Sequence, residues 1–290
     1  MKTAFIINPA AGRGRTEKLW KKLSASLPGS LKKGDAYFTA GPGEAQTLAR
    51  NLSRNAYRQV LVFGGDGTVN EALNGLELNG TALGIVPTGT GNDLCRTLGI
   101  AKDPGKALGQ LAQGKTKLVD MGLVNGRRFL NSVGTGFDAE VVRVTNEQFR
   151  RLRGMPAYLA SLVKVLLVYR SGVITVETES ASFTGKMLLA AVGNGRFIGG
   201  GLEMFPRAAM DDGVFQVVLV GDVPKTQFVM SFPRIFSGTH LSHHRVSSFA
   251  ARRVVIKSGA PLTVQVDGEI VFHPPLEVEL VPKAIPVLVP

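Results

Sequence analysis

Residues 1–120 alternate short apolar runs with segments of helical periodicity, and this alternation constrains the fold more than any other feature of the sequence. The apolar runs predict strands at residues 3–7, 36–38, 60–63, 83–86 and from 118. The segments between them predict helices at residues 17–27, 94–98 and 104–112. They also predict one helix that begins after residue 43 and another that ends at about residue 76. Strands that alternate with helices are typical of parallel βαβ units. This part is therefore predicted to be an α/β domain with a parallel sheet.

After residue 121 the pattern changes to short alternating runs separated by turn signals. Asn125-Gly126 and Asp267-Gly268 are two-residue hairpin signals, and the second part is therefore predicted to be mainly antiparallel β. One exception is PAYLASLVKVLLVY at residues 156–169, which predicts a helix with a proline near its start. We expect a first domain over residues 1–122 and a β-rich domain over residues 123–280.

Composition and charge narrow the class of protein. With 290 residues, 44% of them apolar, the chain can fill substantial cores. Its single cysteine, Cys95, excludes an internal disulfide and fits a reducing compartment. The apolar run at the N-terminus is too short for a signal peptide, and none reaches the ~18 residues of a membrane span. We expect a cytoplasmic protein.

The net charge of +12 favours anionic partners such as nucleotides, nucleic acid or an acidic membrane surface. Charge alone does not choose among them, and it also fits ordinary solubility. No recognisable nucleic-acid-binding module accompanies it, so we expect no nucleic-acid partner.

The stretch LVFGGDGTVNEAL at residues 61–73 places a carboxylate inside a glycine turn between a predicted strand and a predicted helix. Ligands of open α/β sheets bind beyond the carboxyl ends of the strands, and a helix N-terminus favours an anion. Asp66 would repel a bare phosphate, but a bound Mg²⁺ would resolve this conflict because it prefers carboxylate and phosphate oxygens. On this stretch alone, a metal–phosphate site and a purely structural turn remain equally open.

Two further acidic residues follow predicted strands. PTGTGND at residues 87–93 presents Thr90 and Asp93 after one strand, and KLVDMG at residues 117–122 places Asp120 after an apolar run. Because the carboxyl ends of parallel strands meet at one edge of a sheet, Asp66, Asp93 and Asp120 could converge there.

The turn after the first predicted strand, NPAAGRGR at residues 8–15, adds phosphate-binding candidates. Asn8 and Gly12 suit close backbone approach to a ligand. Arg13 and Arg15 could contact phosphate or could equally be solvated surface charges.

The sequence does not match several common kinds of functional site. The chain has no GxxxxGK[ST] motif and hence no P-loop. Cys95 lies inside a predicted helix and is expected to pack there. His240, His243 and His244 have helix-face spacing for a metal but no acidic neighbours, so we predict a surface loop or basic contact patch.

An ordered set of motifs extends over nearly the whole chain. In the first half it comprises NPAAG at 8–12, FTAGPGEA at 38–45, GGDGTVNEALNG at 64–75 and PTGTGNDLCRTLG at 87–99. In the second half it comprises NSVGTGFDAEV at 131–141, VGNGRFIGGGLEMFPRAAMDDGVFQVVLV at 192–220 and VQVDGE at 264–269. This set resembles the diacylglycerol kinase catalytic-domain family, and most closely its bacterial soluble lipid kinases. GGDGT alone is shared with NAD kinases.

The resemblance implies transfer of the ATP γ-phosphoryl group to a lipid hydroxyl, most simply that of diacylglycerol, to give phosphatidic acid. It implies ATP and Mg²⁺ as cofactors, an NAD kinase-like α/β nucleotide-binding domain and a β-sandwich second domain with the active site between them. In such kinases the last strand returns to the first domain, so residues 281–290 are expected to complete it.

The resemblance also assigns roles to particular residues. Asp66, Asp93 and Asp120 match an acidic network near the catalytic Mg²⁺, and Glu269 matches the proton acceptor. ATP contacts are implied at Asn8, Pro9, Ala10, Ala11, Gly12, Thr39, Gly65, Asp66, Gly67, Thr68, Val69, Asn70, Glu71 and Thr90.

A second, structural Mg²⁺ is implied at Asp212, with the backbone carbonyls of Ala209 and Val214 as further ligands. Read from the residues alone, the Asp-Asp-Gly segment at 211–213 is a turn signal and Glu269 is an exposed hairpin residue.

A kinase of this kind must reach a lipid in a bilayer, so we expect transient contact at the inner face of the membrane. The predicted helix at 156–169, preceded by Arg150, Arg151 and Arg153, could receive an acyl chain or rest on the bilayer. The alternative, which we favour, is a helix packed on the β domain. Arg127, Arg128, Arg252 and Arg253 are further cations that could face anionic lipid.

Two alternative functions remain: an NAD kinase, and a non-catalytic lipid- or nucleotide-binding regulator that kept the fold. The sequence does not determine which lipid alcohol is used, nor whether the protein is a monomer or a homodimer.

Overall fold

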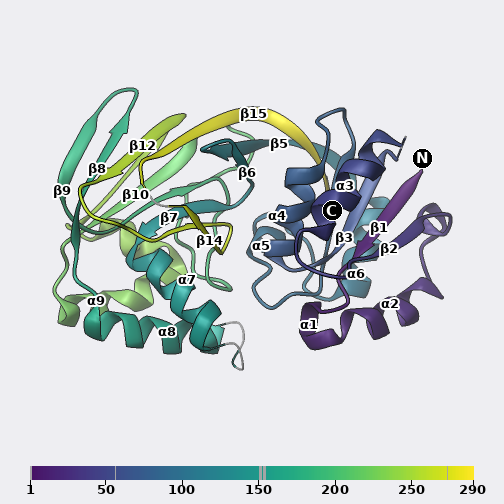
Figure 1. Cartoon of the computed structure of the whole chain (residues 1–290), viewed down its shortest axis with the longest axis horizontal. Coiled ribbons are helices and arrows are strands. Elements are labelled where there is room, and N and C mark those ends of the chain that lie inside the picture. The colour runs from purple at the N-terminus through teal and green to yellow at the C-terminus, as the bar shows by residue number, and fades with distance from the viewer. Residues whose placement is uncertain (1, 56, 150–151, 153–154, 273) are drawn as a thin grey trace. The chain divides into compact units, whose positions relative to one another are not determined.

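The computed structural model describes residues 2–55, 57–149, 152, 155–272 and 274–290 (Figure 1). The chain divides into two compact units. Unit 1 comprises residues 1–119 and 283–290, and unit 2 comprises residues 120–282.

Unit 1 is built on a parallel sheet with the strand order β15-β4-β3-β1-β2. Every residue of β1 and β4 is buried, as are all but the first of β3, which is the pattern of parallel strands covered on both faces. The strands are β1 (Thr3–Ile7), β2 (Asp35–Phe38), β3 (Gln59–Gly64), β4 (Ala82–Pro87) and the end of β15 (Leu276–Val289).

Helices follow the strands of unit 1 and bury their apolar faces on the sheet. Trp20 shows this directly, because its ring lies 4.9 Å from the Phe5 ring on β1 and 5.1 Å from the Phe63 ring on β3. The helices are α1 (Ala11–Gly14), α2 (Thr16–Ser24), η1 (Gly29–Leu31), α3 (Glu44–Arg54), α4 (Asp66–Gly75), α5 (Asp93–Thr97) and α6 (Pro104–Gln113).

Unit 2 is mainly antiparallel β, and strands β5 and β15 each belong partly to unit 1. The main path of strands is β14-β13-β7-β9-β8-β12-β15, while β10 joins β9 to β11 and β5 pairs with β6 and β15. The strands are β5 (Lys115–Val124), β6 (Arg127–Phe129), β7 (Ser132–Gly136), β8 (Gly172–Thr178), β9 (Ser182–Gly193), β10 (Phe215–Gly221), β11 (Val246–Ala251), β12 (Arg253–Ser258), β13 (Val264–Val266) and β14 (Glu269–Phe272).

Strand β9 separates two cores because its side chains alternate between the faces of the sheet. Ala190 and Val192 point into a core formed between strands. Leu189 and Ala191 point the other way, into a core shared with helices α7 (Phe137–Gln148) and α8 (Met155–Val168). The remaining helical segments of unit 2 are α9 (Lys225–Ser231), η2 (Phe232–Ser237) and η3 (Thr239–Ser242).

Both predicted hairpins are confirmed. Asn125 and Gly126 have φ of 47° and 82°, and Asp267 and Gly268 have φ of 49° and 85°. Two consecutive positive values are the signature of the tight turn that these residue pairs favour.

The predicted helix at 156–169 is present as α8, but α7 and α9 are helices that the sequence analysis missed. Helix α7 buries Phe137, Val141 and Val144, which are spaced as one helical face. Its valines favour strands when read locally, so packing on β9 decides its structure. Among the described residues, none of the helices is both long enough and apolar enough to cross a bilayer.

Candidate active site

The turns after β1, β3 and β4 meet at the carboxyl edge of the sheet in unit 1. Asn8 connects two of them, since its backbone N–H donates to Phe63 O at 3.0 Å and its Nδ2 donates to Thr68 Oγ1 at 2.9 Å. Its Oδ1 accepts from the N–H groups of Ala10 and Ala11 at 3.0 and 3.2 Å. One asparagine therefore brings together the predicted residues of the turns after β1 and β3.

Glycines allow these turns to touch. A Cβ on Gly89 would lie 2.4 Å from the Cα of Gly65, and a Cβ on Gly12 would lie 2.7 Å from the carbonyl oxygen of Thr88. Gly12 also has φ of 58°, a conformation that other L-residues rarely adopt. Any larger residue would push the turns apart, so the glycines create a surface where backbone N–H groups can approach a phosphate.

Asp66 and Asp93 begin helices α4 and α5, and their carboxylates approach the same point. A Cβ on Gly91 would lie 2.9 Å from Asp66 Oδ2 and 3.7 Å from Asp93 Oδ2. The N–H of Asn92 donates to Asp66 Oδ2 at 2.9 Å, and Arg96 Nε lies 4.0 Å from Asp93 Oδ1. The structure thus brings two of the three predicted acidic residues together.

Asp93 is buried and Asp66 is partly exposed. Burial raises the pKa of Asp66, although backbone N–H groups partly oppose the shift. Cys95 is buried beside them, as predicted for a packing residue, and burial together with the charges of Asp66 and Asp93 raises the pKa of its thiol.

The acidic pair suits Mg²⁺ that is held jointly with a phosphate. The described part of the chain contains no group of three or more His, Cys, Asp or Glu side chains arranged to hold a metal. Mg²⁺ needs no such cage, because proteins commonly bind it through one or two carboxylates plus substrate phosphates and water. Two carboxylates beside a glycine-lined edge therefore fit both the metal and a nucleotide.

The other residues predicted to bind ATP differ in accessibility. Thr90 is exposed, whereas Pro9, Gly67 and Glu71 are partly exposed. Thr39 is buried at the end of β2 and donates its backbone N–H to Ile7 O at 2.9 Å.

Val69 and Asn70 are buried too, at 3% and 1% exposed. Asn70 Oδ1 accepts a hydrogen bond from Asn74 Nδ2 at 3.2 Å. Their roles as ATP contacts remain predictions.

Asp120 belongs to unit 2 and is fully buried there. Its Oδ2 accepts from Gly213 N at 2.7 Å, and its backbone N–H donates to Met210 O at 2.6 Å. Asn194 Nδ2 donates to Asp120 O at 2.9 Å. These bonds join Asp120 to the turn that carries Asp212, and its convergence with the acidic pair of unit 1 remains a prediction.

The three residues predicted to hold a structural metal lie along that same turn. Asp212 is exposed and its Oδ1 accepts from Val214 N at 3.2 Å, while Ala209 is partly buried. Gly213 O accepts from Arg252 Nε at 3.1 Å, so Arg252 supports this turn.

Glu269 begins β14, and its carboxylate forms an ion pair with Arg127 on β6, with 2.5 Å between Nη2 and Oε2. The sequence analysis did not anticipate this pair. It also missed the role of Asp267, whose carboxylate accepts N–H groups from residues 130, 131 and 132 at 2.9–3.1 Å. The turn that carries Glu269 is thereby fixed to the chain between β6 and β7.

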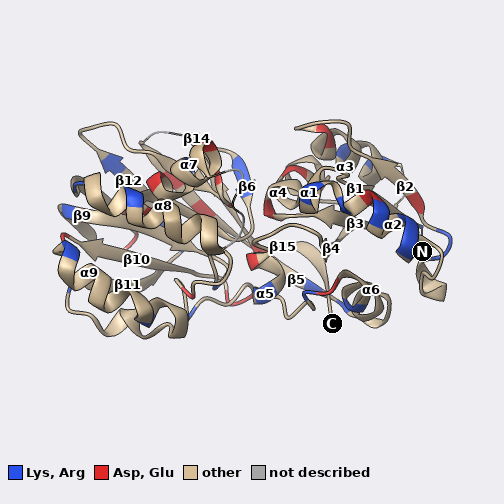
Figure 2. Cartoon of the chain, turned by 90° about the horizontal axis from the view of Figure 1, so that it is seen from below, with Lys and Arg blue, Asp and Glu red and all other residues tan. Residues whose placement is uncertain are grey.

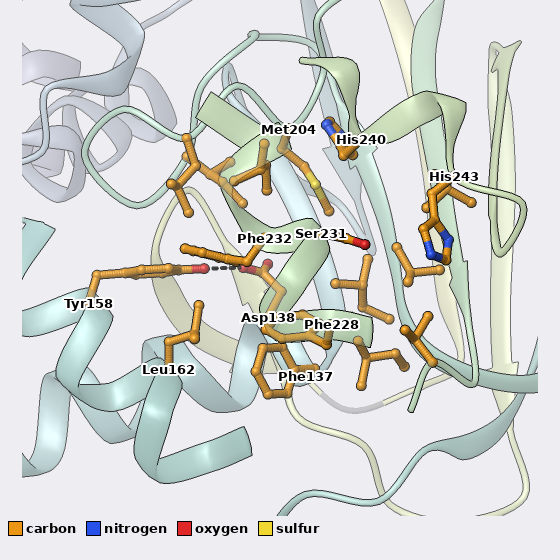
Figure 3. A pocket seen from close by; sticks show the side chains of 18 residues that line it. Phe137, Asp138, Tyr158, Leu162, Met204, Phe228, Ser231, Phe232, His240 and His243 are labelled. Carbon is orange, nitrogen blue, oxygen red and sulfur yellow. Dashed lines mark hydrogen bonds between the residues drawn. The ribbon is translucent and has the colours of Figure 1, made fainter. Parts of the chain in front are cut away.

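An apolar pocket lies in unit 2 among α7, α8, β9, α9 and η2 (Figure 3). The empty space between its lining residues is about 690 Å³, and part of this space is open to solvent. Phe137, Leu162, Leu189 and Phe228 represent its mainly apolar lining.

Asp138 is an ionisable group in the wall of this pocket. Burial raises the pKa of Asp138 to about 6, against the opposing effect of hydrogen bonds from Gln265 and Tyr158.

The histidine prediction was wrong for His240. The His240 ring, from η3, is buried in the lining of the pocket, and burial lowers the pKa of the imidazole. His243 and His244 lie nearer the surface, where their rings stack with 4.5 Å between centroids.

Comparison with known proteins identifies the family. Residues 2–124 match the diacylglycerol kinase catalytic domain, and residues 131–289 match the YegS C-terminal NAD kinase beta sandwich-like domain. The diacylglycerol kinase of Staphylococcus aureus (strain MRSA252) is 30% identical over 270 residues, which cover 91% of this chain and 85% of that protein. The chain belongs to the diacylglycerol kinase family. The diacylglycerol kinase of Bacillus subtilis (strain 168) is 28% identical over 273 residues, covering 93% and 90% of the two chains.

A solved structure of a diacylglycerol kinase from Bacillus anthracis str. Sterne has the same fold. Its TM-score is 0.76 at 22% identity, and the match covers 100% of this chain and 97% of that one. The prediction of an α/β domain with a parallel sheet and a mainly antiparallel β-sandwich domain is confirmed. As a member of the diacylglycerol kinase family, the protein is a lipid kinase.

Proposed function

We propose that this kinase transfers the γ-phosphoryl group of ATP, with Mg²⁺, to the free hydroxyl of diacylglycerol and so forms phosphatidic acid. The observation that carries the proposal is the approach of Asp66 and Asp93 beside the glycine turns of unit 1. The names of the bacterial relatives support diacylglycerol as the acceptor.

In this proposal the turns of unit 1 hold the nucleotide. Asn8, Gly12 and Gly65 present backbone to the phosphates, and Asp66 and Asp93 hold the metal with them. Mg²⁺ would offset charge on the phosphate oxygens during transfer. Phosphoryl transfer depends mainly on positioning and electrostatics, so the acidic pair and the fixed turns supply most of what the reaction needs.

Glu269 is proposed to accept the proton of the lipid hydroxyl as the hydroxyl attacks. Arg127 restrains its carboxylate through the 2.5 Å ion pair. Both partners are partly exposed, so a substrate hydroxyl has access to the carboxylate. Asp120 and the Asp212 turn, with a structural Mg²⁺, are proposed to support this unit.

The apolar pocket is proposed to receive an acyl chain. Its lining from α7, α8 and α9 offers hydrocarbon contacts, and an apolar chain gains about 25 cal/mol for each Å² removed from water.

A panel of acceptors tests the proposed reaction. Purified protein with ATP and Mg²⁺ is expected to phosphorylate diacylglycerol faster than monoacylglycerol, ceramide or a sphingoid base, and to leave NAD unmodified. Labelled product would be resolved by chromatography. Phosphorylation of NAD in preference to every lipid would support the NAD kinase alternative, and no product from any acceptor would support a non-catalytic regulator.

We also propose that one face of unit 2 contacts the membrane surface. Helix α8 packs inward through Ala157, Leu162 and Val165, yet Val168 at its end is 76% exposed. Met230 on α9 is 81% exposed.

The two helices lie beside each other (Figure 1), and Lys225 Nζ of α9 donates a hydrogen bond to the Leu167 carbonyl of α8 at 2.5 Å. Exposed apolar side chains next to cations are characteristic of a surface that rests on anionic lipid.

The cations proposed for this contact are Lys164, Arg170 and Lys225, which could each add about 1 kcal/mol against an anionic bilayer. Figure 2 shows that lysine and arginine residues occur in both units. Arg150, Arg151 and Arg153, which the sequence analysis singled out, lie outside the described residues. Arg253 pairs with Glu277 and Glu279 at 3.6 and 3.5 Å.

Vesicle sedimentation tests the membrane contact. The protein is expected to sediment with phosphatidylglycerol vesicles at low salt and much less at high salt, because salt screens the cations. Met230→Glu is expected to weaken binding at both salt concentrations, whereas Thr226→Glu, with the same charge change on the same helix, should weaken it mainly at low salt. Equal binding to neutral and anionic vesicles would contradict the electrostatic part.

A further inference from the structure

A chain of hydrogen bonds runs from the apolar pocket to the hairpin that carries Glu269. Tyr158 Oη donates to Asp138 Oδ1 at 3.3 Å, and both residues line the pocket (Figure 3). Gln265 Nε2 donates to Asp138 Oδ2 at 3.1 Å. Gly268 N then donates to Gln265 Oε1 at 2.9 Å. Asp138 and Gln265 are each 3% exposed, so solvent competes little for these bonds.

The chemistry of the two neighbours fixes the orientation of the Gln265 amide. Asp138 is ionised at neutral pH, even though burial raises its pKa to about 6, and it can therefore only accept. The backbone N–H of Gly268 can only donate. A glutamine makes both bonds in one orientation, whereas a glutamate would face Asp138 with a second acceptor and an apolar residue would make neither bond.

Gly268 is held from both sides by residues linked to α7. Its N–H reaches Asp138 of α7 through Gln265, and its carbonyl oxygen accepts from Asn146 Nδ2 of α7 at 3.2 Å. Glu269 is the next residue along the chain. Its backbone position therefore depends on α7, while Arg127 restrains its carboxylate.

We infer that Gln265 is a positioning residue of this kinase: it fixes the Gly268–Glu269 backbone to α7 and so holds the Glu269 carboxylate in place for the proton transfer. This inference rests on the proposed role of Glu269. Helix α7 also contributes Phe137 and Asp138 to the pocket, so one helix carries both the wall of the acyl site and the support of the base.

The first test removes both bonds with Gln265→Met, which nearly preserves the side-chain volume. The kcat is expected to fall about 10- to 100-fold, because a base displaced by a fraction of an ångström transfers a proton poorly. The KM values for ATP and diacylglycerol should stay within about twofold. In a Glu269→Gln background, the same substitution should change kcat by less than about twofold, because residues that act through one group are not additive.

The second test reverses the polarity of one bond. Gln265→Glu alone is expected to lower kcat, because two carboxylates then face each other. Asp138→Asn with Gln265→Glu restores a donor opposite an acceptor at the same net charge, and should return kcat to within about threefold of wild type. Thermal unfolding of each variant reports its folding, and the double variant keeps every buried bond even if Gln265→Met fails to fold.

Equal losses from Gln265→Met in the wild-type and Glu269→Gln backgrounds would overturn the inference, as would failure of the double variant to recover activity. A near-normal kcat for Glu269→Gln alone contradicts the proposed base, and it overturns the inference with it. Because that result does not require a Gln265 variant, failure of Glu269 as the base is distinguishable from failure of the inference about Gln265.

Discussion

Asp66→Asn is expected to lower kcat by roughly three orders of magnitude, the largest effect that we predict for a single side chain. The substitution removes one of two carboxylates that lie together at the proposed metal–nucleotide edge. An amide retains an oxygen that can accept the hydrogen bond from Asn92 N, so the turn should keep its shape. Steady-state assays with ATP and diacylglycerol would measure the loss.

Folding of the Asp66→Asn variant should be unimpaired. Burial raises the pKa of Asp66, which means that the folded protein disfavours the charged form that the substitution removes. Asp103→Asn is a matched control, because Asp103 also stands at a helix start and accepts from Lys106 N at 2.8 Å, a role that asparagine fills equally well. A fully active Asp66→Asn enzyme would contradict the proposed site in unit 1.

Glu269→Gln is expected to lower kcat by about 100-fold or more, with a much smaller change in the KM for ATP. The amide has nearly the shape of the carboxylate but cannot accept a proton from the attacking hydroxyl. Glu269 belongs to unit 2, whereas every predicted ATP contact belongs to unit 1, so nucleotide binding should change little. Initial rates over a range of ATP and diacylglycerol concentrations separate the two parameters.

The control for this variant is Glu279→Gln. Glu279 is also a glutamate of unit 2 paired with an arginine, with 3.5 Å between its Oε1 and Arg253 Nε, but more than half of its side chain is exposed. Loss of this surface pair should leave kcat unchanged. If both variants have the same kcat, Glu269 is not the proton acceptor.

Local sequence patterns predicted the helices and strands wherever the pattern of apolar residues in a segment matches the faces that it buries. The parallel strands of unit 1 are continuous apolar runs because both faces of the sheet are covered, and this makes them visible without a structure. The hairpin at Asp267-Gly268 was visible because few residue pairs adopt positive φ at two consecutive positions. Helix α7 was not visible, because its valines favour a strand until packing against β9 is known.

The candidate site likewise has features that the sequence predicts and features that only the structure shows. The ordered motifs predicted Asp66, Asp93 and Glu269 as site residues, and the structure added what contacts them. Arg127 is 142 residues away from Glu269 in the sequence, yet the two side chains form an ion pair. Nothing in the local sequence around either residue indicates the other.

The sequence by itself determined the family, the two kinds of sheet and the glycine turns, because these depend on side-chain periodicity and on backbone freedom within a few residues. The tertiary structure alone decided that Asp138, Gln265 and Gly268 form one hydrogen-bonded chain, and that His240 is buried in a pocket. Hydrogen bonds between residues more than 120 positions apart exist only after the chain has folded, since the packing of α7 on the sheet brings their atoms within reach.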